Sequence, residues 1–122
     1  MASYQPINFE NKFQLLPEQW SPRVIAEMND YQFKVVRLQG EFIWHDHPET
    51  DETFIVIQGR LRIDLPDGHV ELGPGEMFIV PKGTRHKPSA AVETRVLLIE
   101  PRGTPNTGSA GGERTAPPDV WI

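Results

Sequence analysis

The chain has 122 residues, a length that fits one domain and leaves little room for a second independent core. It carries 12 Lys and Arg against 17 Asp and Glu, so the net charge is −5, and the chain lacks the basic tract that nucleic-acid binding requires. The absence of cysteine excludes disulfides, a thiol nucleophile and a thiolate metal site, and it fits a reducing compartment. No stretch approaches the roughly eighteen apolar residues of a membrane span, and the chain does not start like a secretory signal. We therefore expect a cytoplasmic protein without nucleic-acid or membrane partners.

One short helix is expected near the start of the chain. Apolar residues recur at helical spacing over residues 8–16, Asn8 suits the N-cap position, and Pro17 would end the helix. Glycine and proline are frequent, with 10 and 12 residues, so the chain should turn often and contain few long helices.

The rest of the chain is typical of short strands. Runs of β-branched and aromatic residues predict strands over residues 24–28, 31–38, 52–58, 60–65, 69–72, 77–80 and 92–99. The first two strands are joined by Asn29 and Asp30, a dipeptide suited to a hairpin turn, and Asp67 with Gly68 marks another turn. Short strands separated by Gly and Pro corners, without βαβ alternation, indicate an all-β sandwich or small barrel.

Composition divides the chain into two parts. We expect a barrel domain over residues 1–101, including the helix and the first hairpin, and a flexible Gly- and Pro-rich arm over residues 102–122. The arm ends on an apolar triplet, residues 120–122, for which two alternatives remain open. The triplet docks on its own barrel or a neighbouring subunit, or it is a frayed terminus that happens to be apolar.

The histidines carry the chemical signal. His45 and His47 are two residues apart, so on a strand both imidazoles leave the same face, and Glu52 follows at the head of the next strand. Two neutral imidazoles and a carboxylate suit a divalent first-row metal ion. His86 lies far along the chain, but a closed barrel could return it to the same interior as a fourth ligand. His69 follows a turn and is expected to face solvent without a role.

The spacing of these residues resembles the cupin superfamily of small β-barrels. The residues that match its first motif are Gly40, His45-Asp46-His47, Glu52 and Gly59, with one residue fewer than usual after the first glycine. The residues that match its second motif are Gly75, Pro81-Lys82-Gly83 and His86, but Ala90 stands where the family has asparagine. Neither departure removes a ligand.

The resemblance implies a double-stranded β-helix, or jelly roll, that commonly forms a homodimer. It also implies that His45, His47, Glu52 and His86 bind one divalent transition metal ion per chain, whether Fe, Mn, Ni, Co, Cu or Zn. Four protein ligands in an octahedral field leave two positions open for water, O2 or a chelating substrate. The apolar rows of residues 54–56 and 61–65 should then build a chamber around the metal.

Two classes of function follow from such a site. The first is a metal-dependent enzyme that acts on a small oxygen-chelating molecule, such as an acid, a sugar or a diketone. A dioxygenase is favoured over a sugar or keto-acid isomerase, because the sequence shows no second carboxylate or histidine to move a proton. The alternative is a non-catalytic cupin that binds or senses a small ligand.

Overall fold

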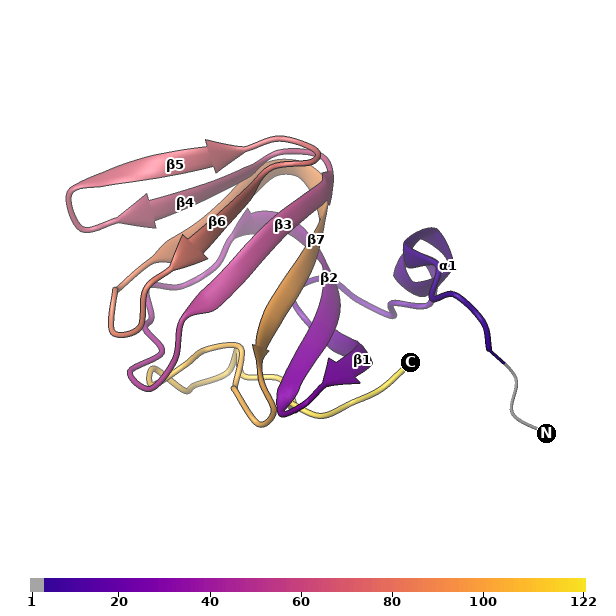
Figure 1. The fold of residues 1–122 in the computed structure, drawn as a ribbon. Helices are drawn as coiled ribbons and strands as arrows, with labels where there is room; N and C mark the ends of the chain where they lie inside the picture. The colour runs from indigo at the N-terminus through magenta and orange to yellow at the C-terminus, as the bar shows by residue number, and fades with distance from the viewer. Residues whose placement is uncertain (1–3) are drawn as a thin grey trace.

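The structure is a computed structural model that describes residues 4–122, so the first three residues of the predicted barrel domain lie outside the described residues. The elements in chain order are α1 (Phe9–Gln14), β1 (Arg23–Met28), β2 (Tyr31–Glu41), β3 (Glu52–Gln58), β4 (Leu61–Leu65), β5 (Gly68–Leu72), β6 (Met77–Val80) and β7 (Lys87–Pro101). The predicted helix, first hairpin and all-β class are confirmed (Figure 1). The last strand is longer than predicted and begins at Lys87 rather than at Val92.

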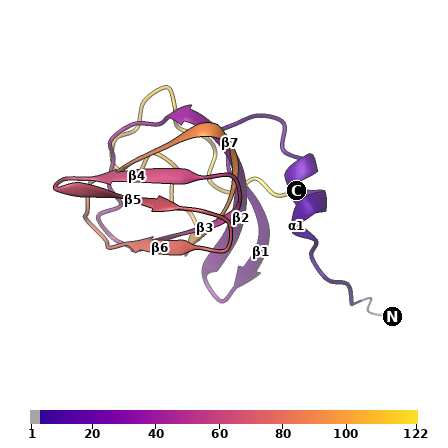
Figure 2. The ribbon, with the colours of Figure 1, turned by 90° about the horizontal axis from the view of Figure 1, so that it is seen from above.

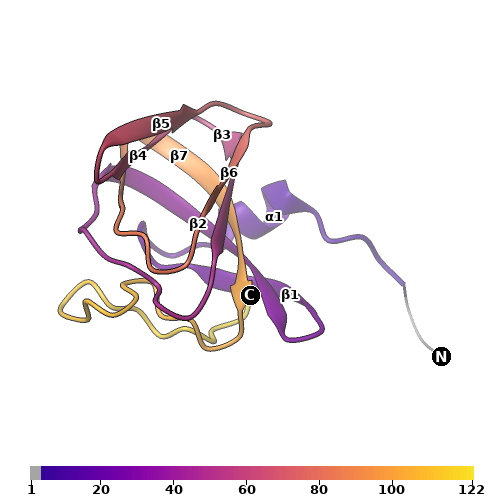
Figure 3. The same ribbon diagram turned by 60° about the vertical axis from the view of Figure 1, so that its left-hand side comes forward.

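Strand β7 organises the sheet. The hydrogen-bonded order is β1-β2-β7-β3-β6, and β4 pairs with both β5 and β7, all antiparallel. The start of β7 pairs with β4, and its later part pairs with β3, while β2 follows it on the other side. The strands therefore curl around an interior, as Figures 2 and 3 show, and form a jelly-roll barrel.

Apolar side chains fill the barrel. The buried cluster consists of Val36, Leu38, Phe54, Val56, Leu61, Ile63, Leu72, Val80, Ala90, Val96 and Leu98. It includes the predicted inward rows, with Leu65 packed against the cluster while only partly buried. The alternation of β3 and β4 is what turns these rows inward.

Helix α1 covers the outer face of the sheet rather than closing the barrel. The Asn8 side chain caps it by accepting a 2.9 Å hydrogen bond from the backbone N–H of Asn11. Phe13 is 1% exposed and belongs to a second cluster with Leu16, Ile25, Val35 and Leu97. Strands β2 and β7 are thus covered by apolar groups on both faces.

The C-terminal arm, residues 102–122, crosses one end of the barrel in a series of turns (Figure 3). Its last residues dock on the chain's own barrel: Val24 N–H donates to Val120 O at 2.8 Å, and Ile122 N–H donates to Val24 O at 3.1 Å. Ile122 also packs against the outer apolar cluster. Of the alternatives for the apolar triplet, the structure shows docking on this barrel. No helix among residues 4–122 combines the length and apolar character needed to cross a membrane.

Candidate metal centre

The four predicted ligands lie together inside the barrel. His45, His47, Glu52 and His86 each offer one donor atom, and these atoms lie within 4.8 Å of one another. All four side chains are buried, with exposed fractions of 4%, 4%, 3% and 0%. The group could therefore hold a metal ion away from bulk water.

Different elements bring these residues to one point. Glu52 opens β3, while His45 and His86 form an isolated bridge in which His45 N–H donates to His86 O at 3.0 Å and His86 N–H donates to His45 O at 2.9 Å. The sequence predicted a strand for the segment that contains His45 and His47, but the structure has no regular strand there. Both imidazoles nevertheless point inward, with their ring centres 5.2 Å apart.

The C-terminal arm packs closely behind His47. Ser109 N–H donates to Asp46 O at 3.0 Å. Gly108 has a φ of +56°, and a Cβ atom there would lie 1.9 Å from Asp46 O and 3.2 Å from His47 Nδ1. Only glycine permits this approach, so the arm helps to hold the segment that carries His45 and His47.

Backbone carbonyls fix two of the imidazoles. Nδ1 of His45 lies 2.9 Å from Ile43 O, and Nδ1 of His86 lies 2.9 Å from Thr84 O. Because a carbonyl only accepts, Nδ1 carries the proton in each neutral ring, and Nε2 is left with a lone pair. This is the tautomer that binds a metal ion through Nε2.

The donor atoms face one another in a way that suits a cation. Oε1 of Glu52 lies 3.3 Å from His86 Nε2 and 3.2 Å from His47 Nε2. Nε2 of His47 is buried and has no hydrogen-bond partner in the part of the chain that the structure describes. Two neighbouring acceptors are unfavourable unless a proton or a cation lies between them, so these residues fit a divalent metal ion.

The pKa values at the cluster favour ligation. Burial, together with the nearby His86, lowers the pKa of His45 from 6.5 to about 4, so its imidazole is neutral at neutral pH. Burial alone would raise the pKa of the Glu52 carboxyl, but a proton between Glu52 and the imidazoles of His47 and His86, in the place of a metal ion, outweighs burial and holds that pKa well below its usual range. Glu52 is therefore ionised, as a carboxylate ligand must be.

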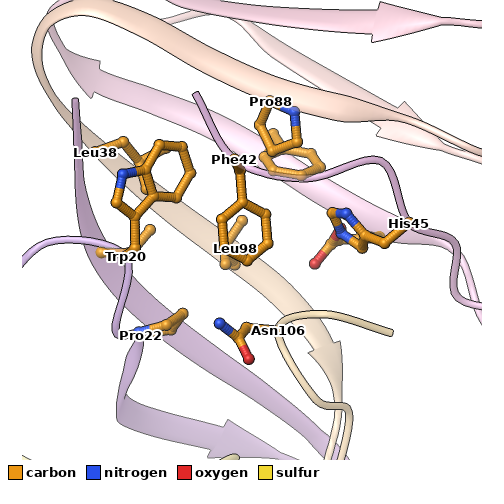
Figure 4. Close-up of a pocket in the computed structure, with 11 residues that line it drawn as sticks. Trp20, Pro22, Leu38, Phe42, His45, Pro88, Leu98 and Asn106 are labelled. Carbon is orange, nitrogen blue, oxygen red and sulfur yellow. The ribbon is translucent and has the colours of Figure 1, made fainter. Parts of the chain in front are cut away.

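An apolar chamber adjoins the cluster. Its lining includes His45 and Glu52 together with Trp20, Pro22, Val36, Leu38, Phe42, Phe54, Pro88, Leu98 and Asn106 (Figure 4). Trp20 and Phe42 stack with ring centres 4.9 Å apart. The space is ≈ 30 Å³, room for about two water molecules. Sequence reasoning identified neither Trp20 nor Asn106 as lining residues, because both come from irregular segments without periodicity.

A second and larger cavity lies on the other side of His47. Its volume is ≈ 450 Å³, and it is bounded by the loop of residues 48–50 and by the arm. Residues of the arm line both spaces. Asn106 lines the chamber, and the larger cavity is lined by Thr104, Gly108 and Ser109. The cluster can thus be approached from two sides.

The structure also contains an ionic pair that the sequence did not indicate. Lys34 Nζ lies 3.0 Å from Glu100 Oε1, with side-chain exposures of 3% and 1%. Glu100 is a second buried carboxyl group beside Glu52, where the sequence analysis found none. The polar residues of strands β2 and β7 show no sequence pattern that would predict that their side chains point into the barrel.

Comparison with known proteins places the chain in a family. Residues 34–100 match the cupin domain family, so the chain belongs to the cupins. Over 77 residues it is 39% identical to the uncharacterized protein YdbB of Bacillus subtilis (strain 168), covering 62% of this chain and 68% of YdbB. The crystal structure of a cupin-2 domain protein from Shewanella frigidimarina NCIMB 400 is 56% identical with a TM-score of 0.77, covering 79% of this chain and 94% of that one.

A further similar structure is that of an enzyme. Hydroquinone 1,2-dioxygenase PnpCD, in complex with Cd²⁺ and 4-hydroxybenzonitrile, superposes with a TM-score of 0.70 at 19% identity, covering 79% of this chain and 72% of that one. At this identity the likeness concerns the fold alone.

Proposed function

We propose that this cupin is a metal-dependent enzyme that acts on a small oxygen-chelating molecule. His45, His47, Glu52 and His86 would hold one divalent transition metal ion, whether Fe, Mn, Ni, Co, Cu or Zn. The observation that carries the proposal is the buried set of four donors within 4.8 Å, in the tautomers and charge states that ligation needs.

The protein's contribution to such chemistry lies in orientation and the exclusion of water. A bound ion would supply Lewis acidity toward substrate oxygens. Backbone carbonyls of Ile43 and Thr84 keep two Nε2 atoms turned to the centre, and the apolar chamber wall around Phe42 and Leu98 keeps bulk water out. The arm adds the Asn106 amide to the chamber wall, where it is held by a hydrogen bond to Arg114 O and by one from Ala116 N–H.

A dioxygenase-type reaction is favoured over sugar or keto-acid isomerisation. The chamber walls offer few polar groups to a polyol, and the buried Glu100 lines neither the chamber nor the larger cavity. Glu49 does line the larger cavity, but it lies on an exposed loop outside the buried cluster. An isomerase base would have to reach the substrate. The shared fold with a hydroquinone dioxygenase is consistent with this preference.

The narrow chamber favours a second candidate function. A space of ≈ 30 Å³ holds water or O2, so a chelating molecule would have to approach the cluster from the larger cavity beside His47. A non-catalytic cupin that binds or senses a small ligand is therefore the alternative. For either function we propose a homodimer in the cytoplasm. The exposed Met77 and Ile79 on the edge strand β6 support the dimer.

The test is elemental analysis of protein purified without added metal or chelator. We expect about one transition metal ion per chain in the wild type, and its loss in His86→Ala and in Glu52→Ala, because four ligands hold the ion. His69→Ala, at an exposed hairpin position, is the control and should keep the ion. Wild-type protein that contains no metal and takes none up would show the proposal to be wrong. Bound iron would direct the first assays to O2 consumption.

A further inference from the structure

The ion pair of Lys34 and Glu100 is buried where such pairs are rare. The two side chains are 3% and 1% exposed, and Nζ lies 3.0 Å from Oε1. Taking an amine and a carboxyl group out of water is costly, and their mutual attraction seldom returns a net gain in stability. The pair is therefore expected to serve a role other than stabilising the fold.

The strand register places this pair next to the predicted centre. Ile99 of β7 is paired with Thr53 of β3, so the next position along the register sets Glu100 beside Glu52 on the inner face. Side chains opposite each other on one face of an antiparallel pair have Cβ atoms about 5 Å apart, so the carboxyl groups of Glu100 and Glu52 are neighbours. Lys34 is paired with Leu98 of β7 and reaches Glu100 diagonally, so Lys34, Glu100 and Glu52 connect β2, β7 and β3.

This connection is anchored at its Lys34 end. Lys34 Nζ also donates to Thr104 O of the arm at 3.2 Å, so this ammonium is held between β7 and the arm. Glu100 Oε1 accepts from Lys34, whereas its Oε2 is buried and finds no donor among residues 4–122. The Glu100 side chain is therefore fixed from the Lys34 side and free to act on its other neighbour, Glu52.

Glu100 is not placed to meet a substrate. It lines neither of the two cavities beside the histidines, and it does not belong to the group of four donor atoms. By the register of β7 and β3, its neighbour in the centre is Glu52. Residues that orient a ligand in this way commonly decide how tightly a metal ion is bound.

We propose that Lys34 and Glu100 are positioning residues, which hold the Glu52 side chain in the orientation that metal binding requires. The inference rests on the proposed metal site and adds to it two residues that do not touch the ion. A purely structural pair would behave differently: its removal would change stability and leave metal affinity as it was.

The decisive variant replaces the whole pair, Lys34→Met/Glu100→Leu. Exchanging a buried ion pair for apolar residues of similar size is often neutral or stabilising, so this protein should fold. We expect its Co(II) affinity, measured by competition with a chromophoric chelator, to fall 10- to 100-fold. The visible absorption of the Co(II) protein should change, and the melting temperature of the metal-free protein should not fall.

A matched control lies on the same two strands. Arg37 and Glu93 form an ion pair at 2.7 Å on β2 and β7, partly exposed and away from Glu52. Arg37→Met/Glu93→Leu should bind Co(II) with wild-type affinity. Glu100→Gln is the conservative variant: its amide can donate to Glu52 while its carbonyl accepts from Lys34, so affinity should stay within about threefold of the wild type.

The outcomes separate this inference from the proposed function. Wild-type protein that fails to bind Co(II) would overturn both. Normal binding by the wild type and equally tight binding by the double variant, with the same spectrum, would overturn the positioning role alone. A double variant that does not fold would overturn it too, because the pair would then serve folding.

Discussion

Neutral, buried His45 makes the free energy of unfolding depend on pH. The pKa of His45 is lowered to about 4 in the folded protein, against 6.5 for an unperturbed histidine. Between these values the unfolded chain binds a proton that the folded protein does not, so stability falls as the pH falls from 6.5 to about 4. For the metal-free protein we expect His45 to contribute about 2.5 kcal/mol to the loss between pH 7.5 and 4.5. Urea unfolding of chelator-treated protein at the two pH values measures it.

Variants assign this pH dependence to one residue. His45→Gln cannot titrate, so its loss of stability over the same range should be smaller by that amount. His69→Gln removes a histidine from the exposed β4–β5 hairpin, outside the buried cluster, and should follow the wild type. If His45→Gln loses as much stability as the wild type, burial of His45 is not the cause.

At the scale of elements, the last residues of the arm act as an extension of the first hairpin. Val120 and Ile122 exchange two backbone hydrogen bonds with Val24 of β1, and Ile122 covers the apolar cluster that α1 also covers. Truncation after Asp119 removes both hydrogen bonds and exposes that cluster, so we expect a loss of about 2 kcal/mol in urea unfolding.

The neighbouring residue provides the control for this truncation. Trp121 is 48% exposed, and Trp121→Ala keeps the backbone bonds of Val120 and Ile122. It should therefore cost about 0.5 kcal/mol. A truncated protein as stable as the wild type would mean that the arm is held by residues 102–119 alone.

Sequence pattern predicted those elements that have one apolar face. In β4, Leu61 and Ile63 alternate with polar residues, and the structure buries both. In β2 the pattern fails, because Val35 is buried against α1 while Val36 is buried in the barrel. A strand covered on both faces shows no alternation, so nothing in the sequence indicated that Lys34 points inward.

The candidate site, like the fold, could be predicted from the sequence only in part. His45, His47, Glu52 and His86 could be found because their spacing is that of a known family. The chamber wall could not, since Trp20 and Asn106 reach it from irregular segments whose course depends on tertiary contacts. Glu100 was hidden for another reason: it lies near the end of a largely apolar strand, where only the register with β3 reveals its neighbour Glu52.

At the scale of the whole molecule, the predicted metal site connects segments far apart in the chain. His45 and His47 follow β2, Glu52 opens β3, and His86 precedes β7, so a bound ion would link the two longest strands, β2 and β7, with β3, which lies between β7 and β6.

Ligands that bind only the folded state stabilise it by mass action. At free Ni(II) of about 100 times its Kd, we expect about 2.7 kcal/mol of added stability and a rise in melting temperature of about 10 °C. His86→Ala should lose most of this rise, because it removes one of the four donors. A rise of equal size in His86→Ala would place the bound Ni(II) elsewhere on the molecule, for which His69 beside Glu71, 3.7 Å apart on the surface, is the first position to test by mutation.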